Sequence, residues 1–312
     1  MSHIHNISLY MPNKKLVFLL PLCVTAMLCT MLHHNMRHMF FPPCESQHTV
    51  NMYRHNSTSQ FNVTIVTAFY DIHRANRDFT MYQEWIKKTL QTPLPFVVFC
   101  HQSQKQLVEH ARRDYMHITK IVTMNTFPLQ GLVSFTEPIA KTIGNGRQWP
   151  EWTNPNYIPL VFSKFIWLIN AMLMDEFNTS HFYWFDAGIS RFFRDGYPLD
   201  RQLEIFTKLP TKGVAIMISP HYSKERIQKM QTSDVIVGSQ EGVIQAGIFG
   251  GSKQPMQLVC NAMMTIFTEY MLARGRIDNE QIGLAVLYTQ YRHWFQPLYQ
   301  DEFSYACTGI CM

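Results

Sequence analysis

The sequence predicts an α/β fold with a mostly parallel central sheet that is covered by helices on both faces. Two observations carry this prediction. Short apolar runs rich in β-branched and aromatic residues alternate with longer segments of helical periodicity, which is the pattern of strand–helix–strand units. Hydrophobic residues make up 46% of the chain and charged residues only 16%. Such a chain can bury a large core, and this excludes disordered, collagen-like and coiled-coil classes.

The first half of the domain begins with two strands and the helix between them. Residues 62–69 form a β-branched run that is typical of a buried parallel strand, and residues 95–100 are a second short apolar strand. Residues 79–90 place a row of apolar and aromatic side chains on one helical face. The next helix and the next strand are expected at 107–114 and 117–124.

A long loop is expected to separate the two halves. Residues 125–156 carry Pro, Gly, Asn and Trp and predict a loop with one helical turn, and loops of this length are usually functional or form a lid. Residues 159–177 follow as a helix with Pro near its start, and its apolar faces are so broad that it must be buried. The remaining strands are expected at 181–185, 213–219 and 243–249, and the remaining helices at 255–274 and 278–291.

An uncharged N-terminal segment predicts a membrane anchor. Residues 16–32 contain no charge, which is the short end of a membrane span, and Lys14 and Lys15 before them favour a cytosolic N-terminus. We therefore expect a cytosolic tail at 1–15, a transmembrane signal anchor at 16–34, a stem at 35–60 and a lumenal domain at 61–312. A cleaved signal peptide and a buried core helix are the alternatives.

Sequons and cysteines agree with a lumenal body. Asn56, Asn62 and Asn178 each begin an N-glycosylation sequon, and all three follow the apolar segment. Five of the seven cysteines also follow it, and an odd number leaves at least one thiol unpaired or pairing between chains. The expected location is that of a single-pass type II membrane protein in the Golgi or elsewhere in the secretory pathway lumen.

Charge and motif content exclude several classes of protein. The formal net charge is +5 and no run of like charge exceeds two residues, so a concentrated basic stripe is missing and no nucleic-acid partner is expected. Neither GxGxxG nor GxxxxGK[ST] occurs, which disfavours a dinucleotide site and a P-loop. Neither GxSxG nor HExxH occurs, so a hydrolase lacks its nucleophile or metal motif.

Ligands of parallel α/β sheets bind beyond the carboxyl ends of the strands, which makes Asp186 the first candidate. It ends an apolar strand and is followed by Ala187 and Gly188. A carboxylate there suits Mg²⁺ or Mn²⁺ that bridges diphosphate oxygens, and Gly188 lets the backbone approach a ligand. Arg191 could contact phosphate or pair with Asp186, and His293 could be a second metal contact. The alternatives are a strand-end Asp in a turn and a packed histidine.

Two other loops supply candidate binding residues. Asp71 follows the first strand and could hold a nucleotide base or ribose, although an ordinary loop explains it equally well. Gly247, Gly250 and Gly251 lie at the expected end of strand 243–249, where glycines permit the close approach of a substrate. A tight turn is the alternative for this glycine group.

Carboxylates and aromatic residues outside these loops complete the candidates. Asp278 and Glu280 stand at an expected helix start, where a carboxylate could act as a base or stabilise a developing cation. Asp278 and Gln281 also have the spacing of a capping box, which is the structural alternative. Trp149 and Trp152 in the long loop could stack on acceptor sugars, with packing in the core or a lid as the alternative.

Four segments of the chain resemble the HtrL/YibB family, and the resemblance spans residues 62–300 or so. Their order is also similar to that of glycosyltransferases of the GT-A fold. This resemblance implies a Rossmann-like, GT-A-like sheet, a nucleotide-sugar donor and a divalent metal, Mn²⁺ or Mg²⁺. It also implies that Thr67, Asp71 and Arg74 lie at the nucleotide. The four segments are TIVTAFYDIHR (64–74), FYWFDAGISRFF (182–193), VIQAGIFGGSKQPM (243–256) and DNEQIG (278–283).

The sequence departs from the GT-A pattern at the metal site. That pattern has a D-x-D at a strand end, whereas this chain contains no D-x-D and Asp186 is the single carboxylate of the corresponding block. A metal shell would then need His293 or water in addition to Asp186. Alternatively, Arg191 would supply the positive charge in place of the metal.

The resemblance implies a membrane-anchored glycosyltransferase that transfers a sugar from a nucleotide-sugar donor to a glycan or glycoconjugate acceptor. In this hypothesis, Asp71 contacts the nucleotide, Asp186 binds the metal diphosphate, and Asp278 or Glu280 is the base or stabilises an oxocarbenium-like transition state. The missing D-x-D motivates an alternative, a non-catalytic lumenal glycan-binding protein on a degenerate transferase fold. No oligomeric state is predicted.

Overall fold

The computed structural model describes residues 62–74, 78–144, 154–192, 213–238, 242–275 and 277–299. All of them belong to one compact unit, Ser57–Met312. Within these ranges, seven strands form a single sheet with the order β3-β2-β1-β4-β6-β5-β7. The strands are β1 (Val63–Phe69), β2 (Phe96–Cys100), β3 (Thr119–Thr123), β4 (His181–Phe185), β5 (Val214–Ile218), β6 (Ile244–Ser252) and β7 (Phe295–Leu298).

The sheet is mixed but mostly parallel. β1 runs parallel to β2 and β4, β2 to β3, and β5 to β7. β6 is antiparallel to both of its neighbours, β4 and β5. The predicted α/β fold with a mostly parallel sheet is therefore confirmed. The strand order reverses at β1, because β2 and β3 lie on one side of it and β4 on the other.

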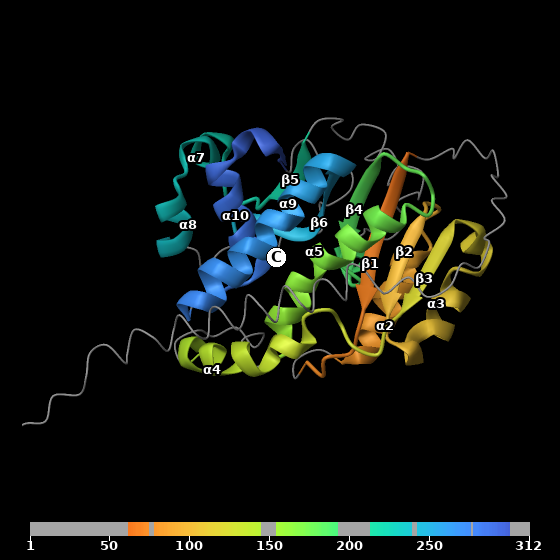
Figure 1. Cartoon of the computed structure of the whole chain (residues 1–312). Helices are drawn as coiled ribbons and strands as arrows, with labels where there is room; N and C mark the ends of the chain where they lie inside the picture. Colours follow the sequence, from red (N-terminus) through yellow and green to blue (C-terminus); the bar gives the residue numbers. More distant parts are fainter. Residues whose placement is uncertain are drawn as a thin grey trace, which may run out of the picture. The chain divides into compact units, whose positions relative to one another are not determined.

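Helices cover both faces of the sheet (Figure 1). α2 (Phe79–Leu90) and α3 (Lys105–Ala111) pack on one face, and α5 (Tyr157–Met174), α9 (Lys253–Thr265) and α10 (Glu280–Gln290) pack on the other. The other α-helices are α4 (Val133–Gly144), α7 (Lys224–Lys229) and α8 (Thr232–Gly238). Short 3₁₀ turns lie at Gln102–Gln104, Arg113–Ile118, Gln130–Leu132, Ile189–Phe192, Leu272–Arg274 and Arg292–Trp294, and Ile266–Met271 is π-helical.

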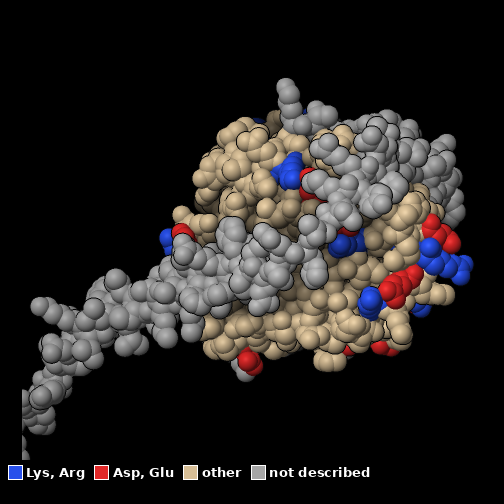
Figure 2. Space-filling model, turned by 45° about the vertical axis from the view of Figure 1, so that its right-hand side comes forward, with Lys and Arg blue, Asp and Glu red and all other residues tan. Residues whose placement is uncertain are grey.

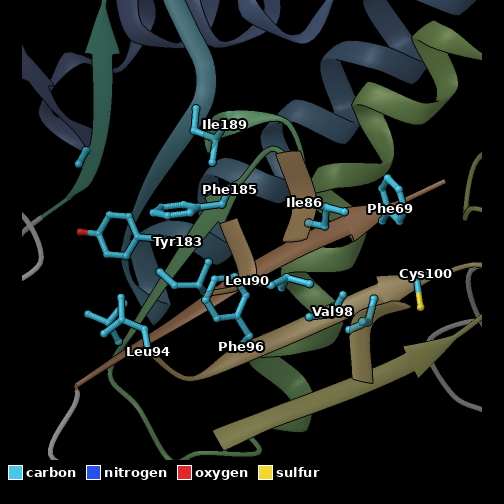
Figure 3. Packing of buried hydrophobic residues seen from close by; sticks show 14 residues of the cluster. Phe69, Ile86, Leu90, Leu94, Phe96, Val98, Cys100, Tyr183, Phe185 and Ile189 are labelled. Atoms are coloured by element: carbon cyan, nitrogen blue, oxygen red, sulfur yellow. The ribbon is translucent and has the colours of Figure 1, made fainter. Parts of the chain in front are cut away.

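Alternate residues of the central strands fill a core on each face of the sheet. On the α2 face, Figure 3 shows Phe69, Phe96 and Tyr183 packed around Ile86 and Leu90 of α2. On the α5 face, the core is an aromatic stack in which Trp167 of α5 lies parallel to three rings. These are Tyr70, Phe99 and Trp184, at centroid distances of 5.5, 6.1 and 5.9 Å.

α5 is the central helix of the second core. It is the one helix of the described ranges that is long and apolar enough to cross a membrane, and 67% of its most apolar window is buried. Because it packs against β1 and β4, it is a core helix, as its broad apolar faces predicted. The expected tail, anchor and stem, residues 1–60, lie outside the described part of the chain, and so do Asn56, Trp149 and Trp152.

The structure corrects two predicted segments. The strand expected to end at Phe249 continues to Ser252, because Gly250 and Gly251 pair with β4 and β5 on either side. The region 125–156 was expected to be a loop with one turn but contains α4, a helix of 12 residues that accommodates Pro138. A prediction from turn-forming residues alone missed it because Gly and Pro weaken a helix without forbidding one.

Other differences concern short or peripheral elements. The helix expected at 255–274 consists of α9, the π-helical segment Ile266–Met271 and a 3₁₀ turn that ends at Arg274. β7, α7 and α8, each of which has at most seven residues, were not predicted from the sequence. Segments this short show too few periods of a pattern to be recognised.

The described sequon and cysteine residues have defined surroundings. Asn62 and Asn178 are exposed, and the Asn62 side-chain oxygen accepts hydrogen bonds from the backbone N–H and the hydroxyl of Ser180. Cys100 and Cys260 are buried free thiols. Burial raises the pKa of the Cys100 thiol to about 11, which makes it a poor nucleophile at neutral pH.

Charged side chains lie mainly at the surface, with three exceptions in the described part of the chain. On the face shown in Figure 2, Lys and Arg are scattered among Asp and Glu. The buried charged residues are Arg112, Lys164 and Glu280. The Arg112 guanidinium donates to the carbonyls of Leu90, Thr92 and Leu94 and to the Thr119 hydroxyl, at 2.6–2.8 Å. Arg112 therefore joins the end of α2, the turn before β2 and the start of β3.

Replacing Arg112 with Met should destabilise the fold by about 3–5 kcal/mol, because three buried carbonyls would lose their donor. Urea unfolding of the full-length chain measures this change. The control is Arg113→Met, since Arg113 is exposed and its one ion pair among the described residues is with exposed Asp114, and it should cost less than about 1 kcal/mol. Equal effects of the two substitutions would contradict a structural role for Arg112.

Candidate functional site

The reversal of strand order places two loops side by side at one edge of the sheet. β1 and β4 are adjacent and parallel, so the loop after β1, which begins at Tyr70, lies next to the loop after β4, which begins at Asp186. In open α/β sheets, ligands bind in the crevice outside the carboxyl ends of such a strand pair. The fold thus brings the two loops that carry Asp71 and Asp186 to one place.

A buried lysine joins two of the predicted site residues. The Lys164 ammonium of α5 lies 2.9 Å from Asp186 Oδ1 and 2.6 Å from Glu280 Oε1. It also donates to the Ala246 carbonyl of β6 at 3.3 Å. An ammonium has three protons, and each has an acceptor here. We call Lys164, Asp186 and Glu280 the ion cluster.

Each member of the ion cluster is positioned by its own element. Lys164 lies on the side of α5 that faces β4, with its ammonium 5.7 Å from the centre of the Trp184 ring. The Trp184 indole N–H donates to Asp186 Oδ1 at 2.7 Å. Glu280 is the first residue of α10, a helix capped by Asn279, whose side chain accepts from the Ile282 N–H. The N-cap is thus Asn279 and not Asp278, which differs from the capping box that was the structural alternative for Asp278.

The Lys164 ammonium is charged at neutral pH. Burial alone would lower the pKa of Lys164, but the adjacent carboxylates of Asp186 and Glu280 outweigh burial and raise this pKa above its ordinary value. The contribution of the charged lysine to stability is therefore complete below the ordinary lysine pKa and is lost only as the pH rises through the raised value.

The two carboxylate oxygens of Asp186 differ in their contacts with the described residues. Oδ1 is occupied by the Trp184 indole and the Lys164 ammonium, whereas no hydrogen bond from the described residues reaches Oδ2. The side chain is 40% exposed, in contrast to 4% for Glu280. Gly247 of β6 accepts the Asp186 N–H at 2.9 Å, and a Cβ on Gly247 would lie 3.7 Å from Oδ2. Among the described residues, Asp186 is thus held through Oδ1, and its Oδ2 has no donor.

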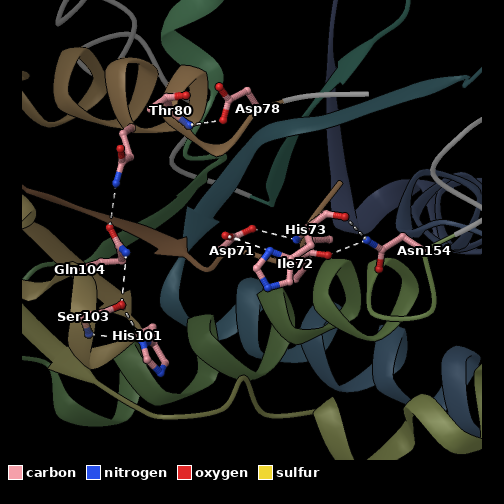
Figure 4. Close-up of polar contacts among 10 residues, drawn as sticks. Asp71, Ile72, His73, Asp78, Thr80, His101, Ser103, Gln104 and Asn154 are labelled. Carbon is pink, nitrogen blue, oxygen red and sulfur yellow. Dashed lines mark hydrogen bonds and ion pairs between the residues drawn. The ribbon is translucent and has the colours of Figure 1, made fainter. Parts of the chain in front are cut away.

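The loop after β1 is held in a defined conformation. Asp71 accepts a hydrogen bond from the His73 N–H at 2.7 Å and lies 3.2 Å from the His73 ring (Figure 4). Asn154 donates to the Ile72 carbonyl at 2.6 Å, which ties the loop to the start of α5. Thr67 lies within β1, before the loop, and its buried hydroxyl has no partner among the described residues.

Two guanidinium groups converge on a pair of aromatic rings of α2. Arg74, from the loop after β1, donates to the Tyr82 hydroxyl at 2.7 Å. Arg191, from the loop after β4, lies 5.3 Å from the centre of the Trp85 ring. Tyr82 and Trp85 contact each other edge to face at 5.0 Å. Gly188 packs against both rings, where a Cβ would lie 3.2 Å from Trp85.

Other predicted residues lie elsewhere. Gly250 and Gly251 pair with the beginning of β4, away from the edge that carries Asp186, and both are buried. A Cβ on Gly250 would overlap the Tyr183 ring, so its packing role is evident. His293 precedes β7, whose Phe295 pairs with Val214 at the start of β5. The structure therefore does not bring His293 to Asp186.

The described residues do not fit a divalent metal at Asp186. They contain no group of three or more His, Cys, Asp or Glu side chains that could hold a metal ion. Mg²⁺ and Mn²⁺ need several oxygen ligands, whereas Asp186 shares one oxygen with an ammonium at 2.9 Å. The positive charge of Lys164 stands beside the carboxylate that would have to bind the cation.

Lys164 was not among the site residues predicted from the sequence. A single lysine in an otherwise apolar helix is usually placed so that its ammonium reaches water. The available signal was the burial of α5 itself, because a lysine on a helix that is apolar on all faces must be buried and needs a carboxylate partner. Asp186 and Glu280 were already candidate site residues, and each has the carboxylate that a buried lysine needs as a partner.

Together, the fold and the site define an α/β protein with a mostly parallel, mixed sheet and a buried lysine that pairs with two carboxylates beside the end of β4. A family model described as "Bacterial protein of unknown function (HtrL_YibB)" matches residues 61–304. The chain therefore belongs to the HtrL/YibB family, which confirms the resemblance seen in its segments. None of the curated proteins matches the sequence.

Solved structures with a similar fold include the apo form of mouse xyloside xylosyltransferase 1. The similarity covers 76% of this chain and 84% of that chain, with 8% sequence identity and a TM-score of 0.39. It is a distant structural match to a glycosyltransferase.

Replacing Lys164 with Met should destabilise the fold by about 3–5 kcal/mol, because two carboxylates would lose their shared cation. Adding Glu280→Gln to this variant should restore part of the loss, since only one anion then remains unpaired. Urea unfolding of the full-length chain measures both.

Lys87→Met is the matched control for this substitution. Lys87 lies 2.6 Å from Glu84, the same separation as in the Lys164–Glu280 pair, but both side chains are well exposed. Its loss should change the free energy of unfolding by less than about 1 kcal/mol. A Lys164→Met variant as stable as Lys87→Met would show that the ion cluster does not form.

Proposed function

We propose that the chain is a glycosyltransferase that uses a nucleotide-sugar donor and a glycan or glycoconjugate acceptor. The observation that carries this proposal is the fixed Asp186 carboxylate, which offers one accessible acceptor in the crevice of the switch point. Such crevices bind nucleotides in open α/β sheets. A charged carboxylate oxygen is a strong acceptor for the hydroxyl groups of a sugar.

In this proposal, each of the two loops contacts a different part of the donor. The loop after β1, with Asp71, contacts the nucleoside, and Asp186 Oδ2 accepts a hydrogen bond from a hydroxyl of the transferred sugar. Gly247 supports this arrangement, because a Cβ there would lie 3.1 Å from Ile189 Cδ1 and 3.7 Å from Oδ2, so a larger residue would crowd the carboxylate. Glu280 is enclosed and paired with Lys164, so Asp278, half-buried two residues earlier, is the proposed base.

The charge balance of the ion cluster favours a second candidate function, a glycan-binding protein without transferase activity. Lys164 forms ion pairs with Asp186, the predicted metal ligand, and with Glu280, one of the two predicted catalytic carboxylates. The two candidates differ in turnover. A transferase hydrolyses or transfers the sugar of its nucleotide-sugar donor, whereas a glycan-binding protein leaves that donor intact.

A nucleoside diphosphate should raise the melting temperature of the full-length chain in detergent. At a hundred times Kd, binding adds about 2.7 kcal/mol of stability, or roughly 5–10 °C for a domain of this size. The measurement is a thermal-shift panel of UDP, GDP, CDP and ADP. The shift should be lost in Asp186→Asn, when each variant is compared with its own unliganded state.

Asp175→Asn is the matched control for the nucleotide experiment. Asp175 also pairs with a lysine, Lys253 at 3.1 Å, but it lies before β4, at the opposite edge of the sheet from Asp186. This variant should keep the full shift. The absence of any shift in the folded wild type, or equal shifts in both variants, would refute the proposed nucleotide site.

The apolar segment at 16–32 and the three sequons support a second part of the proposal, a type II anchor with the domain in the Golgi or another secretory lumen. Treatment of the chain expressed in a eukaryotic cell with an N-glycosidase should then increase its electrophoretic mobility. Asn178→Gln should remove part of this change, because Asn178 is exposed. An unchanged mobility would argue against a lumenal domain.

A further inference from the structure

The orientation of the Asp186 carboxylate is set by two buried donors. Its Oδ1 accepts the Trp184 indole N–H at 2.7 Å and the Lys164 ammonium at 2.9 Å. Both donor side chains are buried, and hydrogen bonds to an ionised group are about twice as strong as neutral ones. Rotation of the carboxylate plane away from this orientation would break both bonds. The two donors therefore fix the direction in which Oδ2 points.

The Trp184 ring is itself held by α5. It stacks on Trp167 of α5 at a centroid distance of 5.9 Å, with 6° between the two planes. The Lys164 ammonium lies 5.7 Å from the centre of the same ring. Lys164 and Trp167 are three residues apart, a spacing that places them on one face of a helix. One face of α5 thus supplies the first donor and holds the ring that carries the second.

The residue type at 184 matches a role in holding an anion. Trp184 and Asp186 are two positions apart at the end of β4, so their side chains leave the chain on the same side. The indole N–H only donates, whereas a tyrosine hydroxyl can also accept and a phenylalanine has no polar atom. Packing of the aromatic stack needs only a ring. The N–H is the part of Trp184 that the stack does not explain.

We propose that Trp184 is a positioning residue of the ligand site, whose indole N–H acts with Lys164 to orient Asp186 so that Oδ2 accepts a hydroxyl group of the donor. This inference rests on the proposed function and specifies how its central acceptor is prepared. A carboxylate that is oriented before the ligand arrives does not have to be ordered on binding, which improves the affinity. Trp184 acts through Asp186 and does not itself contact the ligand.

Trp184→Phe tests this role, because it removes the N–H and keeps an aromatic ring in the stack. The probe is the nucleotide among UDP, GDP, CDP and ADP that stabilises the wild type most. In titration calorimetry on the full-length chain in detergent, the substitution should weaken binding of this nucleotide by about tenfold, since Asp186 loses a charge-assisted donor and must be ordered on binding.

Trp294→Phe is the matched control for the calorimetry. Trp294 also stacks on a ring, that of Tyr291 at 4.3 Å. It directly precedes β7, which begins beside the start of β5, at the opposite edge of the sheet from Asp186. Removal of its N–H should leave the affinity unchanged. An unchanged affinity in Trp184→Phe, or equal losses in the two variants, would overturn the inference.

A spectroscopic readout separates positioning from a loss of stability, and it does not require Trp184→Phe to fold. In NMR spectra of the chain labelled with ¹⁵N at its indoles, the Trp184 N–H is assigned through its contacts with the Trp167 ring. Its signal should shift in Asp186→Ala, which removes the acceptor, and also when the nucleotide binds to the wild type. The Trp294 signal should shift in neither case. A Trp184 signal that stays unchanged while the nucleotide binds would contradict the proposed role.

The outcomes separate this inference from the proposed function. A nucleotide that binds the wild type and Trp184→Phe equally, but not Asp186→Asn, would support the nucleotide site and refute the role of Trp184. A folded wild type that binds none of the four nucleotides would refute the nucleotide site, and the role of Trp184 in ligand binding would be refuted with it.

Discussion

The arrangement of the candidate site depends on the contacts of the Lys164 ammonium. A charge buried in an α/β core is tolerated only when its hydrogen bonds are complete, and here the three acceptors come from three different elements. Asp186 follows β4, Glu280 begins α10 and Ala246 belongs to β6. One side chain of α5 thus fixes the positions of the strand end, the helix start and the antiparallel strand that surround the crevice.

This constraint explains why the predicted residues divide into two groups. Asp186 and Glu280, which are 94 residues apart in the sequence, meet because one lysine requires two anions. Gly250 follows Gly247 after only two residues but lies along the strand and packs on Tyr183. Proximity in the sequence is therefore a poor guide to the site, whereas charge compensation is a good one.

Much of the fold could be predicted from the sequence because its central strands are apolar on both faces and its helices alternate with them. The segment 79–90 coincides with α2, since its periodicity and the capping Asp78 act together. The route of the chain after β4 could not be predicted. β6 contains three glycines and runs antiparallel, and only contacts with β4 and β5 decide its direction. Lys164 was missed because its partners are distant in the sequence.

The account is tested most directly by a crystal structure of the full-length chain soaked, in the presence of EDTA, with the nucleoside diphosphate that stabilises it most. We predict that the nucleoside diphosphate lies at the carboxyl ends of β1 and β4, next to Asp186. We also predict that Lys164 remains bonded to Asp186 and Glu280. A ligand bound elsewhere, or a Lys164 side chain turned away from both carboxylates, would contradict the central claim.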